Sequence, residues 1–71
     1  MGKTTMQVAL AKVLASMNMA DSTKVLISLT LTSDDDIGRF LQWLKDTVPE
    51  DKILSMEEEI AGKAIEIAKS K

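Results

Sequence analysis

The stretch Lys24–Thr32, which reads Lys-Val-Leu-Ile-Ser-Leu-Thr-Leu-Thr, alternates apolar and polar side chains. Alternation with a period of two residues is typical of a β-strand that buries one face. The side chains expected on the buried face are Val25, Ile27, Leu29 and Leu31. Those expected on the opposite face are Leu26, Ser28, Thr30 and Thr32. This is the only strand that the sequence predicts, and its backbone N–H and C=O groups need a second strand as partner.

A helix is predicted before this strand, over residues 5–18. Its apolar residues recur at the spacing of one face of a helix, and they are Met6, Leu10, Val13, Leu14 and Met17. Thr4 and Gln7 have the spacing of a capping box, which marks the start of a helix. Asp21-Ser22-Thr23 is interpreted as a polar turn that leads into the strand.

Two more helices are predicted after the strand, over residues 34–47 and 55–69. Ser33 is placed to cap the first of them, which should end near Pro49 because proline disfavours a helical residue before it. Ser55 and Glu58 have the spacing of a second capping box. Glu59 and Lys63 are expected to form an ion pair one turn apart. The predicted order is therefore helix, strand, helix, helix.

The length of 71 residues sets how such a chain can be stabilised. It allows one domain, residues 1–71, whose core is marginal by itself. The sequence has no cysteine, so a disulfide is excluded as reinforcement. An identical chain is the simplest source of the missing second strand. We therefore expect an α+β domain that forms an intertwined homodimer around an antiparallel two-stranded ribbon.

The charge distribution bears on the choice of partner. The formal net charge is −2, and residues 34–59 hold nine of the acidic side chains. Because contact with phosphate needs clustered cations, this acidic region disfavours nucleic acid and favours a basic protein surface. The acidic runs 34–36 and 57–59 are interpreted as first-turn residues that complement the helix dipole. We expect no metal ion and no cofactor at them.

Catalysis is not expected, because the sequence offers neither histidine nor cysteine to activate a nucleophile. Trp43, the only tryptophan, lies at the edge of the apolar face of its helix and is a candidate anchor for a partner protein. Packing within the chain is the favoured role for its ring, and the anchor is the alternative. No apolar run approaches the roughly 20 residues of a membrane span, and no signal peptide is apparent. A cytoplasmic location is expected.

Residues 24–68, with the alternating strand, the cap at Ser33 and two following helices, resemble the ribbon-helix-helix family of DNA-binding proteins. The resemblance implies a dimer whose ribbon reads bases in the major groove. By position, the base-reading side chains would be Leu26, Ser28, Thr30 and Thr32. None of these is the Arg, Asn or Gln that usually makes paired hydrogen bonds to a base. DNA-binding regulation is therefore the alternative, and the leading expectation is a small acidic regulatory protein that acts through protein–protein contacts.

Overall fold

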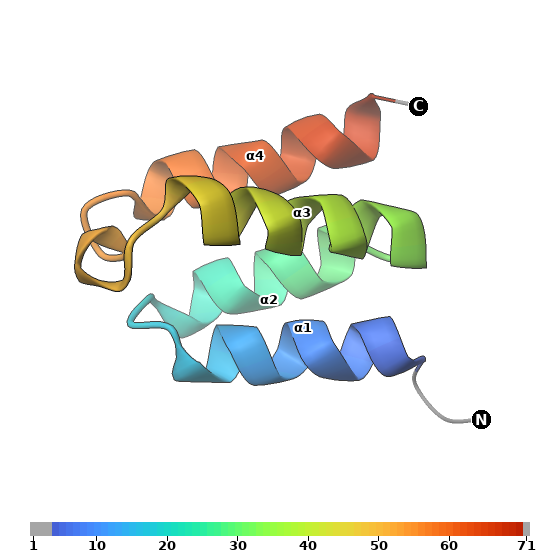
Figure 1. Cartoon of the computed structure of the whole chain (residues 1–71), viewed down its shortest axis with the longest axis horizontal. Helices are drawn as coiled ribbons and strands as arrows, with labels where there is room; N and C mark the ends of the chain where they lie inside the picture. The colour runs from blue at the N-terminus through green and yellow to red at the C-terminus, as the bar shows by residue number, and fades with distance from the viewer. Residues whose placement is uncertain (1–3, 71) are drawn as a thin grey trace.

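The computed structural model of the chain describes residues 4–70, and within them the secondary structure is helical (Figure 1). The elements in chain order are α1 (Thr5–Ser16), α2 (Asp21–Thr30), α3 (Asp34–Thr47), the 3₁₀ turn η1 (Glu50–Lys52) and α4 (Glu57–Lys69). Residues 4–70 contain no β-strand, so the predicted α+β fold with an antiparallel ribbon is wrong. The ribbon-helix-helix-like architecture is wrong for the same reason.

Consecutive helices run in opposite directions and form a four-helix bundle (Figure 1). Helix α1 packs against α2 and α3, and α4 also packs against α2 and α3. The side of the bundle formed by α1 and α2 therefore lies opposite the side formed by α3 and α4. None of the helices within residues 4–70 is both long and apolar enough to cross a bilayer.

All four helices contribute to one apolar core. Its largest fully buried side chains are Phe40, Ile27, Leu31, Ile37 and Ile60. Leu10 and Leu14 of α1 and Ala64 and Ile67 of α4 extend it along the bundle. Small helical domains depend on this kind of close helix packing.

The predicted strand Lys24–Thr32 is helix α2 for most of its length. Thr23, Ile27 and Leu31 recur every four residues, so the same sequence also fits one face of a helix. A helix closes its backbone hydrogen bonds within one chain, whereas a lone strand leaves them open. The predicted turn Asp21-Ser22-Thr23 is accordingly the first turn of α2.

The two faces assigned to the strand do not exist as predicted. Ile27 and Leu31 are buried, but Val25 is 56% exposed and Leu29 74% exposed. On the other predicted face, Leu26 is also exposed, as are Ser28 and Thr32, while Thr30 is partly buried. The Thr30 hydroxyl donates to the Leu26 carbonyl, which is a hydrogen bond within the helix (2.6 Å).

Two of the three predicted helix caps are confirmed. Thr4 and Gln7 form the capping box of α1, and the Ser33 hydroxyl accepts from the Asp36 N–H at the start of α3. The capping box at Ser55 is wrong, because the Ser55 hydroxyl donates to the Lys52 carbonyl and α4 begins two residues later. Helix α1 ends at Ser16 rather than at residue 18, since Met17 has an extended backbone.

Candidate protein-binding groove

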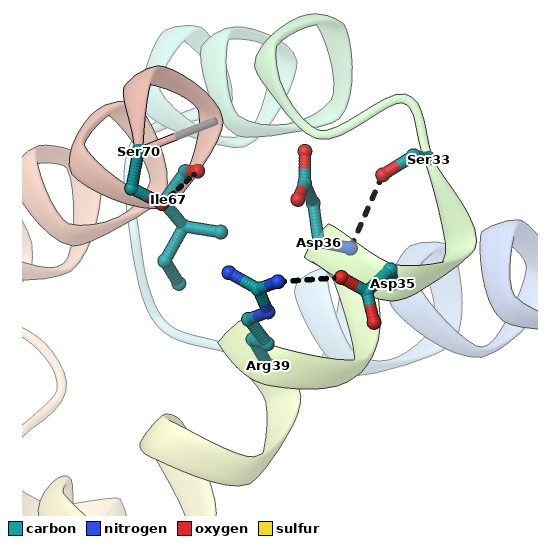
Figure 2. Close-up of polar contacts among 6 residues, drawn as sticks. All are labelled: Ser33, Asp35, Asp36, Arg39, Ile67 and Ser70. Carbon is teal, nitrogen blue, oxygen red and sulfur yellow. Dashed lines mark hydrogen bonds and ion pairs between the residues drawn. The ribbon is translucent and has the colours of Figure 1, made fainter.

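A wide groove of about 740 Å³ runs between α3 and α4 on the outside of the bundle. Its floor combines Gly38 and Trp43 of α3 with Ile67 of α4. Charged and polar side chains form its rim, and they are Asp34, Asp35, Arg39, Gln42, Asp46, Lys63, Glu66 and Ser70. Figure 2 shows one end of the groove, where Arg39 of α3 lies between Asp35 and Ile67. The groove thus joins an apolar floor to a rim in which carboxylates outnumber cations.

Trp43 is held firmly in the floor of this groove, where it is half-buried. Its ring stacks on the buried ring of Phe40, with the centroids 6.3 Å apart and the planes inclined by 25°. The Lys63 ammonium lies 5.9 Å from the Trp43 ring centroid, within the range of a cation–π interaction. The structure therefore places one part of the Trp43 ring against the core and leaves another part exposed in the groove.

The ionic groups on the rim are restrained by their neighbours. The Arg39 guanidinium donates to Asp35 (2.7 Å), and the Lys63 ammonium donates to Glu66 (3.0 Å). The predicted pair of Lys63 with Glu59 is not formed, because Lys63 turns toward Glu66 and the groove. These exposed pairs add little to folding stability, since water screens them.

The amide of Gln42 holds the carboxylate of Asp46, donating to both of its oxygens (3.1 and 3.0 Å). Asp46 lies in the last turn of α3 and Glu66 lies near the end of α4. Carboxylates are disfavoured there by the negative end of the helix dipole. The contacts that these carboxylates make one turn away, with Gln42 and Lys63, offset part of this cost.

The acidic run at the start of α3 divides into different environments (Figure 2). Asp34 and Asp35 are exposed, whereas Asp36 is only 2% exposed. The Asp34 carboxylate accepts from the Thr4 hydroxyl (2.8 Å), which ties the start of α3 to the start of α1. The run thus places carboxylates at the positive end of the α3 dipole, as the sequence indicated. Two of them, Asp34 and Asp35, also line the groove.

The acidic run at the start of α4 has a structural contact through Glu57. Its carboxylate accepts from the Thr23 hydroxyl (2.6 Å) and from the Ala20 N–H (3.0 Å). The hydrogen bond from Thr23, followed by that from the Ala20 backbone, lowers the pKa of Glu57. Within residues 4–70, no three Asp or Glu side chains are grouped so that they could hold a metal ion.

The sequence singled out Trp43 as a candidate anchor but did not indicate the residues that surround it in the groove. Asp35 and Glu66 face one groove although 31 positions separate them in the sequence. The sequence held one local sign of this acidic rim. Asp46 and Glu66 lie near the C-terminal ends of their helices, where the helix dipole disfavours carboxylates. The residues predicted to form a ribbon lie on α2 or directly after it and do not line this groove.

Comparisons with known protein families, with curated proteins and with solved structures find no match to this chain. The function must therefore be argued from its own residues.

Proposed function

We propose that the chain is a non-enzymatic protein-interaction module whose groove between α3 and α4 binds a basic segment of a partner protein. The observation that carries the proposal is the half-buried Trp43 ring among rim carboxylates that come from two helices. A tryptophan supplies a large apolar contact, and the carboxylates supply attraction for Lys or Arg side chains.

The charge of the molecule supports a basic partner. Residues 33–70 hold ten carboxylates against five cations, whereas residues 4–32 hold Asp21 against Lys12 and Lys24. The negative potential is therefore concentrated in the half of the chain that forms the groove, where it accelerates encounter with a positive surface. Duplex DNA is repelled by the same potential.

The test uses the fluorescence of Trp43, since the chain has no other tryptophan and no tyrosine. A Lys/Arg-rich peptide should change the emission of Trp43 in a saturable way, and 0.5 M salt should weaken its binding. An acidic peptide of the same length should leave the emission unchanged.

Matched variants locate the binding surface. Neutralising the rim with Asp46→Asn and Glu66→Gln should weaken binding of the basic peptide about tenfold, which corresponds to about 1.4 kcal/mol. Neutralising Asp51 and Glu58 changes the net charge equally but leaves the groove intact. If both pairs of substitutions weakened peptide binding equally, the groove would not be the binding site and the effect would come from net charge alone.

A further inference from the structure

The outer surface of α1 and α2 carries most of the exposed large apolar side chains of residues 4–70. Val8 of α1 is 41% exposed, and on α2 Val25, Leu26 and Leu29 are 56%, 43% and 74% exposed. Outside these two helices, the comparable side chain is Leu54, at 61%. An exposed leucine is ordinary when it stands alone, but apolar side chains that gather on one face mark an interaction surface.

Small side chains leave hollows between the two helices. One of about 320 Å³ is lined by Ala11, Ala15 and Val25, and one of about 260 Å³ lies next to it beside Ala11 and Ser28. Leu29 borders both hollows and rises beside them. The surface therefore presents a projecting leucine next to a recess floored by alanine, which is the complementarity of packed helices.

The charges on the outer face of α1 and α2 are compatible with a second copy of the chain as the partner. Helix α1 contributes only Lys12, and α2 contributes Asp21 and Lys24, of which Lys24 lines the larger recess. The carboxylates concentrated in residues 33–70 lie mainly on the opposite side of the bundle. Two copies that meet through α1 and α2 therefore keep their acidic sides apart, and the charges on the helices that meet are limited to Lys12, Asp21 and Lys24 of each copy.

We propose that α1 and α2 form the interface of a homodimer, in which Leu29 of each copy enters the recess at Ala11 and Ala15 of the other. Such an interface is self-complementary, as a two-fold axis requires. The exposed surface of one chain is 4723 Å², and a stable interface needs about 800 Å² from each partner, which is about one sixth of that surface. The outer faces of two of the four helices are sufficient for this area.

The test is sedimentation equilibrium of the full chain with two matched substitutions. The wild-type protein should sediment at twice the 7.8 kDa chain mass at micromolar concentration. Leu29→Lys should raise the dimer dissociation constant at least tenfold, whereas Leu54→Lys, a similar change at an exposed site outside the face, should leave it unchanged. Far-UV circular dichroism should show that both variants remain helical.

A wild-type chain that stays monomeric at 100 µM, or equal weakening by the two substitutions, would overturn the dimer. If a monomeric chain bound phosphatidylcholine vesicles and Leu29→Lys abolished this binding, the face would belong to a lipid surface instead. Binding of the basic peptide, followed through Trp43 on the opposite side, reports on the groove independently of these results.

Discussion

At the scale of single residues, Glu57 connects helices that meet at one end of the bundle. It belongs to α4, yet its carboxylate accepts from the Ala20 N–H just before α2 and from the Thr23 hydroxyl in the first turn of α2. Ala20 precedes α2 and makes no side-chain cap, so Glu57 supplies an acceptor that the local sequence does not. One carboxylate thereby ties the start of α4 to the start of α2.

Folding stability should depend on the ionisation of Glu57 below neutral pH. Its pKa in the folded protein lies below the ordinary value of 4.5, because Thr23 and the Ala20 amide stabilise the charged form. The stabilisation is therefore complete above pH 4.5 and is lost as the pH falls through the lowered pKa. Glu57→Gln should lower the thermal unfolding midpoint at pH 7 and have a much smaller effect at the acid end of a pH series.

The control for this prediction is Glu58→Gln, which removes a neighbouring exposed carboxylate that makes no such contact to α2. At pH 7 its midpoint should fall much less than that of Glu57→Gln, because it loses only the interaction with the α4 dipole that all three carboxylates of the run share. A constant gap between Glu57→Gln and the wild type across the series would show that the charge of Glu57 is irrelevant.

At the scale of elements, α2 is the segment whose assignment decides the fold. In a strand, Ile27 and Leu29 share a face and would cost similar stability when truncated. In α2, Ile27 is fully buried and Leu29 is 74% exposed. Ile27→Ala should therefore destabilise the chain by about 2–5 kcal/mol, whereas Leu29→Ala should change stability by about 0.5 kcal/mol or less.

Chemical denaturation followed by circular dichroism measures both changes. The protein should be dilute enough that dimer formation does not contribute, since Leu29 is the central residue of the proposed interface. Similar losses from the two substitutions would contradict the helix and restore the two-faced strand.

The helices that the sequence predicted well are those with local signals at their starts. Thr4 with Gln7 and Ser33 with the acidic run that follows it are caps whose bonds form within one turn. Lys24–Thr32 has no such signal, and its apolar residues fit a period of two as well as a period of four. The choice between them depends on α1 and α4, which receive Ile27 and Leu31 into the core, and packing between distant segments is not visible in a local pattern.

At the scale of the whole molecule, the bundle separates two kinds of surface. The groove with Trp43 and the carboxylates lies between α3 and α4, and the apolar face lies on α1 and α2 on the other side. The charge asymmetry was readable from the sequence, because it follows from which residues are acidic. The groove could not be predicted from the sequence, because it forms only when α3 packs along α4 and brings Asp35 and Glu66 to the same groove.

The two proposals together predict bivalent binding. A dimer joined through α1 and α2 points its two acidic grooves in opposite directions, so both can be engaged at once only by basic peptides on flexible linkers long enough to reach around the dimer. Simultaneous engagement converts the second contact into an intramolecular one and can raise the overall affinity about 10²-fold or more. The wild-type protein should therefore dissociate much more slowly from a biosensor matrix densely loaded with such flexibly linked peptides than from a sparsely loaded one.

Leu29→Lys separates this effect from the affinity of one groove. It should leave binding at low peptide density unchanged, because Leu29 lies outside the groove, and it should abolish the slow dissociation at high density. If the variant dissociated as slowly as the wild type from the dense surface, the grooves would not be linked through α1 and α2.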